Sequence, residues 1–257
     1  MKVHGEELSD VTRYLEKNKG ETLAGKKSGF RRILSYVGKY KPISSDLRII
    51  EIGTGTGSFP ILCALAGYDC EGLEISQQLI NHAHAWGKEL GVEPNIRLGN
   101  VETTDLGESV YDVLIASSVF EHIEFWRPAL KKMYRALKPG GALFFESTNK
   151  WSIKSGELPQ MPCYGWLPNQ ARFALRKIIH GRDIMKLGID FHQFTYLGLR
   201  NAFRQVGFSE IHDVSDLVDT TNKSGWKLKL IQQMRSNSLL RETVLLFMEA
   251  TTFVCVK

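Results

Sequence analysis

The stretch Arg48-Ile-Ile-Glu-Ile-Gly-Thr-Gly-Thr-Gly-Ser58 decides how the rest of the chain is interpreted. It begins with a short β-branched apolar run, which is typical of a strand buried on both faces of a sheet. Gly53, Gly55 and Gly57 follow at alternating positions, and apolar residues recur at helical spacing from Ser58 onward. A strand, a glycine loop and a helix in this order predict a nucleotide-binding site, because glycines let a ligand approach the backbone and the helix amides donate to it.

Two classes of ligand use this geometry, and the glycine spacing separates them. Dinucleotide sites favour G-x-G-x-x-G, whereas this loop is G-x-G-x-G and follows an acid, Glu51. Together these features resemble motif I of the class I S-adenosylmethionine-dependent methyltransferases, although the glycines alone fit a structural turn equally well. An acidic loop suits the sulfonium and α-amino group of that cofactor. The resemblance implies cofactor contacts by the motif residues Glu51, Gly53, Thr54, Gly55 and Gly57.

Length and composition bound the class of protein. The 257 residues are 43% hydrophobic, which is enough to bury one large core, and α/β domains of this length are commonly single. We therefore expect one domain over residues 1–257, with a lid. No apolar run reaches the roughly 18 residues of a membrane span, and the first residues lack the apolar segment of a signal peptide. These features predict a cytoplasmic protein.

The cysteines and the net charge are less specific. Cys63, Cys70, Cys163 and Cys255 stand singly in apolar or strand-like contexts without C-x-x-C spacing, so buried free thiols are expected, and no metal site. The net charge of +5 permits acidic partners without requiring them.

The first 46 residues are polar and helix-prone. Phe30, Ile33, Leu34 and Val37 form a narrow apolar stripe, and Pro42 ends the pattern. One or two helices packed beside the sheet are predicted for residues 1–46. In the family that the glycine loop resembles, such a leader often covers the cofactor.

The second and third predicted strands end in groups that suit a nucleoside. Asp69–Glu74 ends in an acid where the strand gives way to a helix, so Glu74, followed by Ile75, is expected to accept the ribose hydroxyls. The alternative for Glu74 is an exposed helix-capping acid. After Asn95–Leu98 the resemblance implies an adenine site.

The residue at the expected adenine position departs from the family pattern. Family members usually carry an acid there that accepts the adenine amino hydrogens, whereas this chain has Asn100, whose side-chain oxygen carries no charge. Asn100 and Val101 are the predicted adenine pair. Glu102 or Asp105 is the alternative holder of the acid's role.

The middle of the chain extends the resemblance. Tyr111–Ser117 is a buried strand, and residues 117–122 after it resemble the segment that meets the methionine end of the cofactor, with Ser117 as the expected contact. Residues 137–141, Leu-Lys-Pro-Gly-Gly, resemble motif III, in which a helix ends and the chain enters a fifth strand, Ala142–Glu146.

These alternating elements predict an α/β fold. We expect a Rossmann-like, mostly parallel sheet with helices on both faces, and the resemblance implies seven strands with the last antiparallel. Strand six is placed at Ser209–Val214 and the last strand within Phe247–Val256. The predicted site residues end strands, so they meet at one edge of the sheet. A nicotinamide-dependent enzyme would have the third glycine one residue later, and motif III would not be expected in it.

Two segments depart from the minimal fold. Residues 149–194 form a lid insertion in the family, and Ser147-Thr-Asn149 before it resembles the ubiquinone-type and other small-molecule methyltransferases. Residues 217–246 are a helical elaboration without an assigned role. Within the insertion, residues 169–182 form a basic amphipathic segment, which favours an acidic or phosphorylated acceptor, an anionic membrane surface, or simply a solvated helix face. We expect it to present Arg172, Arg176, Lys177, His180 and Arg182.

Methyl transfer needs few side chains, because the sulfonium is already activated and the protein mainly aligns the acceptor and excludes water. If the acceptor is a hydroxyl, a histidine can take its proton. His122 and His192 are the candidates by placement, and each is alternatively an ordinary polar residue.

Three functions compete. The first is a methyltransferase that converts S-adenosylmethionine to S-adenosylhomocysteine while methylating a small molecule, at oxygen rather than nitrogen or carbon. The second is a nucleic-acid or protein methyltransferase; nucleic acid is disfavoured because Ser147-Thr-Asn-Lys150 replaces the N-P-P-[YF] tetrapeptide that grips a flipped base. The third is a catalytically idle cofactor-binding protein.

Overall fold

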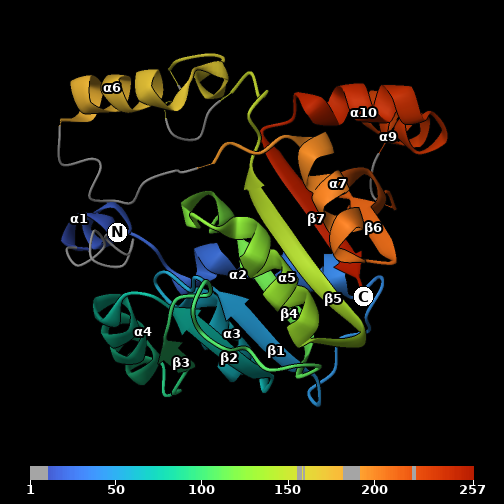
Figure 1. Ribbon diagram of the computed structural model, residues 1–257. Coiled ribbons are helices and arrows are strands. Elements are labelled where there is room, and N and C mark those ends of the chain that lie inside the picture. The colour runs from blue at the N-terminus through green and yellow to red at the C-terminus, as the bar shows by residue number, and fades with distance from the viewer. Residues whose placement is uncertain (1–10, 155–157, 159, 182–191, 222–223) are drawn as a thin grey trace.

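The computed structural model describes residues 11–154, 158, 160–181, 192–221 and 224–257. Its centre is a seven-stranded sheet in the order β3-β2-β1-β4-β5-β7-β6 (Figure 1). Strands β1 to β5 pair in parallel, and β7 runs antiparallel to both β5 and β6, which confirms the predicted Rossmann-like fold. The strands are β1 Arg48–Ile52, β2 Asp69–Glu74, β3 Asn95–Leu98, β4 Tyr111–Ser117, β5 Leu137–Thr148, β6 Glu210–Asp213 and β7 Ala250–Val256.

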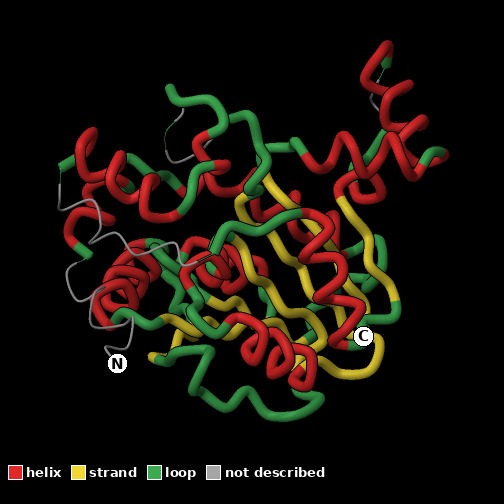
Figure 2. The backbone as a smooth tube through the Cα atoms, turned by 45° about the horizontal axis from the view of Figure 1, so that its top comes forward, coloured by secondary structure: helices red, strands yellow, loops and turns green. Residues whose placement is uncertain are grey.

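Helices lie on both faces of the sheet (Figure 2). The apolar side chains of α2, α3 and α8 pack on one face, and those of α5, α7, α9 and α10 pack on the other. The α-helices are α1 Thr12–Lys17, α2 Leu23–Val37, α3 Ser58–Ala66, α4 Gln77–Glu89, α5 Trp126–Ala136, α6 Asn169–His180, α7 Tyr196–Val206, α8 Val214–Leu217, α9 Gly225–Ser236 and α10 Ser238–Leu246. Within the described part of the chain, two 3-10 turns, η2 Phe120–His122 and η3 Tyr164–Trp166, lie in the connections.

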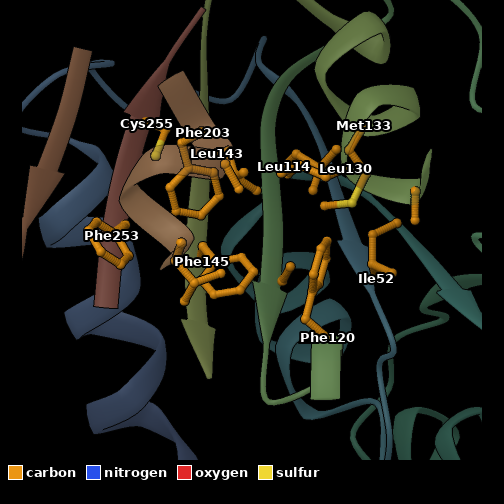
Figure 3. Packing of buried hydrophobic residues seen from close by; sticks show 14 of the residues in the cluster. Ile52, Leu114, Phe120, Leu130, Met133, Leu143, Phe145, Phe203, Phe253 and Cys255 are labelled. Atoms are coloured by element: carbon orange, nitrogen blue, oxygen red, sulfur yellow. The ribbon is translucent and has the colours of Figure 1, made fainter. Parts of the chain in front are cut away.

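An aromatic cluster fills the α5 and α7 face of the sheet (Figure 3). The ring of Phe145 on β5 lies 4.9 Å from that of Phe120 on η2 and 5.2 Å from that of Phe203 on α7. Phe203 in turn lies 5.3 Å from Phe253 on β7. All four side chains are fully buried. Because each buried Phe contributes about 1.5–3 kcal/mol, this cluster fixes η2, and with it the segment after β4, to the sheet.

Several predicted boundaries shift. Strand β5 begins at Leu137, which pairs with Tyr111, and pairing resumes at Ala142 with Val113, so residues 138–141 form an irregularity inside the ladder rather than a loop before it. Tyr111, the first residue of β4, already pairs with Leu137, so β5 begins before the Pro-Gly-Gly sequence instead of after it. Helix α2 ends at Val37, ahead of Pro42. Its apolar stripe does face the core.

The basic face predicted for residues 169–182 is corrected by the structure. Arg172 and Arg176 are buried, with 0% and 9% of their surface exposed. The Tyr164 hydroxyl donates to the backbone oxygen of Arg172 at 3.0 Å, and the guanidinium of Arg172 donates to Asn169 Oδ1 at 3.1 Å. The lid insertion therefore packs Arg172 inside itself, and it buries Arg176 as well, which a helical wheel cannot anticipate. Helix α6 ends at His180, and Arg182 lies outside the described residues.

The predicted elaboration at 217–246 is two helices that meet at Asn237, whose side chain accepts from Leu240 N at 3.0 Å and caps α10. Asn149, at the start of the lid, donates to three carbonyls at and just beyond the end of α10, those of Leu245, Leu246 and Met248. Among the described residues, no helix is long and apolar enough to cross a bilayer. The four cysteines are free thiols, and Cys63, Cys70 and Cys255 are buried.

Candidate cofactor and acceptor site

A cavity of about 170 Å³ opens at the carboxyl ends of the parallel strands. It lies where topology brings together the glycine loop, the ends of β2, β3 and β4, and the leader helix α1. The polar and backbone groups on its wall that bear on function belong to Tyr14, Gly53, Gly55, Glu74, Ile75, Asn100, Val101, Glu102, Ser118 and His122. This is the edge of the sheet at which the strand-ending motifs were expected to meet.

The glycine loop has the backbone that only glycine adopts readily. Gly53, Gly55 and Gly57 have φ of +71°, +55° and +80°. A Cβ on Gly53 would lie 2.5 Å from Val119 Cγ2, and one on Gly55 would lie 2.7 Å from the Tyr14 hydroxyl, so both glycines permit close packing at the cavity wall. Gly57 does not line the cavity.

The third glycine and its neighbour serve the packing behind the loop. A Cβ on Gly57 would lie 2.3 Å from Ala83 Cβ, so this glycine lets α3 begin against α4. Thr54 is buried and does not line the cavity either. Two of the five motif I residues named from the sequence therefore face the cavity, and Thr54, Gly57 and Glu51 support it from behind.

Glu74 stands at the end of β2, on the cavity wall. Its carboxylate accepts from the backbone amides of Gly55 at 2.9 Å, Ile75 at 2.9 Å and Ser76 at 3.1 Å. Burial raises the pKa of Glu74, although these three amides oppose the shift. The carboxylate thus braces the glycine loop against the start of α4. A carboxylate has about four acceptor positions, so it retains capacity for a ligand hydroxyl.

Glu51 is a buried acid behind the glycine loop. Its side-chain Oε2 atom is enclosed and has no hydrogen-bond partner among the described residues. Burial raises the pKa of Glu51 well above its usual value, the Glu74 carboxylate raises it further, and Lys26 opposes both. A buried carboxyl with one unpartnered oxygen, beside a loop of bare backbone, fits a ligand that brings positive charge. The residues present therefore fit a sulfonium cofactor with an α-amino group.

The leader helix α1 closes one side of the cavity. Val11 and Tyr14 line it, and burial raises the pKa of Tyr14 to about 12, with further contributions from Glu21, Glu74 and Glu51. Thr56 in the glycine loop donates to Glu21 at 3.1 Å, and Glu21 also pairs with Lys26 on α2. The leader was predicted beside the sheet, but nothing in the sequence singled out Tyr14, because only the tertiary packing brings it to Gly55.

Ser117, the predicted cofactor contact at the end of β4, does not line the cavity. Ser117 Oγ lies 3.5 Å from Glu146 Oε1, and the next residue, Ser118, lines the cavity instead with a φ of +53°. Side chains alternate along a strand, so a shift of one residue exchanges the two faces. Glu146 itself is held by Arg32 on α2 through two hydrogen bonds of 2.6 and 2.9 Å, a contact that sequence reasoning missed.

The two candidate histidines lie in different surroundings. His122, at the end of η2, lines the cavity. His192 lines a separate hollow with Trp126 and Arg127, and its Nε2 atom lies 2.8 Å from the backbone oxygen of Glu124. Its backbone amide donates to the oxygen of Glu121 at 3.3 Å. His122 therefore lies in the same cavity as the predicted cofactor residues. His192 contacts the backbone of Glu121 and Glu124, beside His122 in the chain, but lines the separate hollow.

Fold and site together have the features of an S-adenosylmethionine-dependent methyltransferase: a Rossmann-like sheet, a glycine loop, an acid at the end of β2 and a buried acid suited to a sulfonium. The family model described as "Methyltransferase domain" matches residues 12–213, and the chain belongs to this family.

Curated relatives extend the comparison at low identity. The chain is 29% identical over 126 residues to a ubiquinone biosynthesis O-methyltransferase of Rickettsia conorii, a match that covers 48% of this chain and 43% of that protein. It is 25% identical over 186 residues to the protein of the same name from Rickettsia canadensis, covering 72% and 71%. The chain thus matches less than half the length of the first relative.

Solved structures share the fold. An S-adenosylmethionine-dependent methyltransferase from Mesorhizobium loti aligns with a TM-score of 0.60 and 18% identity, over 92% of this chain and 100% of that one. A Haemonchus contortus phosphoethanolamine N-methyltransferase 2, in complex with S-adenosyl-L-methionine, aligns with a TM-score of 0.57 and 15% identity, over 88% and 52%. At these identities the likeness concerns the fold alone.

Proposed function

We infer that the protein transfers the methyl group of S-adenosylmethionine to the oxygen of a small molecule. The observation that carries this proposal is the convergence of Glu74, the glycine loop and His122 on one cavity beneath α1. The small-molecule acceptor is supported by the relatives named as ubiquinone biosynthesis O-methyltransferases. S-adenosylhomocysteine is the expected product.

The chain's own residues suggest how the cofactor would be held. Gly53 and Gly55 present bare backbone, and Glu74 would accept the ribose hydroxyls. The positive charge of the bound methionine end would lower the raised pKa of Glu51, and the ionised Glu51 carboxylate would then stabilise that charge from behind the loop. The turn at Asn100 and Val101 would hold the adenine. When bound, the cofactor supplies an already activated methyl group.

His122 is the residue that we assign to the acceptor's proton. A histidine imidazole is ordinarily neutral near physiological pH, so it can take a proton from a hydroxyl as the methyl group is transferred. His122 is placed for this role because it lines the cavity, and η2 is fixed by Phe120 in the aromatic cluster. His192 is then a residue that fastens the lid's return to the segment carrying His122.

The alternatives retain less support. An anionic acceptor or an anionic membrane surface was suggested by the basic segment of the lid, and the burial of Arg172 and Arg176 removes two of its cations from the surface. A nucleic-acid or protein methyltransferase would use the same cofactor cavity, so only the identity of the acceptor distinguishes these classes of enzyme from a small-molecule methyltransferase. An idle cofactor-binding protein would bind S-adenosylmethionine without turnover.

The test is an acceptor screen with matched histidine variants. Purified protein is incubated with S-adenosylmethionine and panels of phenols, catechols, amines, RNA and unfolded protein, and S-adenosylhomocysteine release is followed by mass spectrometry. We expect turnover with a phenolic or catecholic acceptor. His122→Gln should lower kcat at pH 7 by about 10²- to 10⁴-fold, the usual size of general-base effects, with recovery as the pH rises and the acceptor ionises by itself. His192→Gln should keep most of the activity.

Two results would contradict this proposal. Turnover only with RNA or protein would move the enzyme to the second class of function. Full activity of His122→Gln across the pH range would remove this histidine from the chemistry and leave the cofactor site unaffected.

A further inference from the structure

Ser118, the residue after β4, has a backbone conformation that few serines adopt. Its φ of +53° lies in the left-handed region, where Cβ crowds the backbone and residues other than glycine are disfavoured. In the described part of the chain, Ser109 and Cys163 are the other non-glycine residues with a positive φ. Neither of those two lines the cofactor cavity, whereas Ser118 does. Strain that is kept at a cavity wall, where a glycine would relieve it, indicates a role for the side chain.

The segment around Ser118 is fixed on both sides. Its backbone amide donates to the backbone oxygen of Glu146 on β5 at 2.8 Å. Val119 packs against the glycine loop so closely that a Cβ on Gly53 would lie 2.5 Å from Val119 Cγ2. Phe120 is fully buried in the aromatic cluster. Because these contacts hold the unfavourable φ, Ser118 keeps its side chain at the cavity before any ligand binds.

The Ser118 hydroxyl is available to a bound molecule. The residue is exposed and lines the cavity, and its hydroxyl makes no hydrogen bond to the residues that the structure describes. Ser117 beside it turns the other way, with its Oγ atom 3.5 Å from Glu146 Oε1. His122 lines the same cavity one 3-10 turn later, where its backbone amide donates to the oxygen of Val119 at 3.0 Å. One fixed segment thus presents both a hydroxyl and an imidazole to the cavity.

We propose that Ser118 binds the methyl acceptor: its hydroxyl donates to the acceptor oxygen while the acceptor's own O–H donates to His122. The inference rests on the proposed function and adds a contact to the acceptor, not to the cofactor. A hydroxyl oxygen has two lone pairs. With one lone pair held by Ser118 and the proton directed at the imidazole, the second lone pair is left to point at the methyl carbon. Ser118 thus supplies alignment, and the acceptor's proton still passes to His122.

The experiment compares Ser118→Ala and Ser118→Gly, with catechol, or the phenol that the wild type methylates fastest, as the acceptor probe. Ser118→Ala removes the hydroxyl and keeps the backbone strain, whereas Ser118→Gly removes both. Each variant should lower kcat/KM for the probe by about 3- to 10-fold, the size expected for a neutral hydrogen bond. The dissociation constant of S-adenosylhomocysteine, measured by calorimetry, should stay within about twofold of the wild-type value in both.

Two further measurements separate the hydroxyl from the backbone and from His122. Ser118→Gly should unfold at a temperature equal to, or up to about 3 °C above, that of the wild type, because relief of strain offsets the added freedom of the unfolded chain. Ser109 has the same φ outside the cavity, so Ser109→Gly should share this thermal behaviour and keep the wild-type rate. The defect of His122→Gln should shrink as the pH rises and the probe ionises. The defect of Ser118→Ala should persist, because a phenolate oxygen still accepts from a hydroxyl.

The outcomes separate this inference from the proposed function. Wild-type kcat/KM in Ser118→Ala would overturn the inference while the methyltransferase site stands, even if Ser118→Gly is impaired, because the backbone and not the hydroxyl would then matter. Weaker binding of S-adenosylhomocysteine by Ser118→Ala would assign the hydroxyl to the cofactor and overturn the inference as well. No turnover of any phenol or catechol in the acceptor screen by the wild type would overturn the proposed function itself.

Discussion

Replacing Glu74 should lower both the affinity for the cofactor and the free energy of unfolding. The two effects have different structural causes and can be measured separately. Its carboxylate accepts three backbone amides and lines the cavity. Glu74→Ala frees these amides, and an unsatisfied buried donor costs about 1–3 kcal/mol. Water from the open cavity reaches some of them, so we expect a fall of about 2–4 kcal/mol in the free energy of unfolding. Glu74→Gln keeps acceptance from Ile75 and Ser76, sets two donors face to face at Gly55, and should cost about 1–2 kcal/mol.

Cofactor affinity reports the second contribution. Loss of a charged partner for the ribose hydroxyls should weaken S-adenosylhomocysteine binding by about 1.5–3 kcal/mol in either variant, measured by titration calorimetry under conditions where the variant is folded. Glu71→Gln is the matched control, because Glu71 lies on the same strand and accepts from Tyr111 at 2.8 Å outside the cavity. It should lower stability and leave affinity unchanged. Unchanged affinity in folded Glu74→Gln would refute the ribose assignment.

Three further variants test packing and charge. Phe145→Ala should lower the free energy of unfolding by about 3–5 kcal/mol, measured by urea denaturation, because it opens a cavity at the centre of the aromatic cluster. Gly57→Ala should destabilise by about 2–4 kcal/mol, since φ is +80° and the added carbon meets Ala83; near-wild-type stability would show that α3 shifts freely. Burial would raise the pKa of Asp112, but hydrogen bonds from Lys138, Arg48 N and Lys41 outweigh it and lower the pKa. Asp112→Asn should therefore cost about 1–2 kcal/mol at pH 7, and the deficit should shrink as the pH falls below about 4, where the unfolded carboxyl takes up its proton; a deficit independent of pH would contradict this.

The elements that sequence predicted well are those whose signals are local. Arg48–Ile52, the glycines and Glu74 each mark a strand end through neighbouring residues, and the resemblance to a known family ordered them. A helix start such as Thr195, which accepts from Gly198 N at 3.1 Å, is equally local. Their convergence on one edge then follows from parallel topology alone.

What the sequence did not predict depends on contacts between distant segments. Arg32 and Glu146 form an ion pair although 114 positions separate them in the sequence, and no motif around either residue predicts the contact. Arg172 reads as a surface cation on a helical wheel, and only the packing of the lid shows that it is buried. The role of Glu102 was left open with Asp105 because both are acids in one turn, and their directions depend on Phe125 and Gly107.

The two ends of the lid insertion are joined to each other. Lys150 N donates to the oxygen of Phe194 at 2.7 Å, so the chain leaves β5 and returns for α7 at almost the same point. A segment whose ends already touch can change length at little entropic cost, because closing a longer loop costs only about 0.6 kcal/mol per doubling. The insertion is thus a module that substitution, deletion or recombination can exchange while the sheet keeps its geometry. We expect changes of acceptor to arise in that module, independently of the methyl donor site.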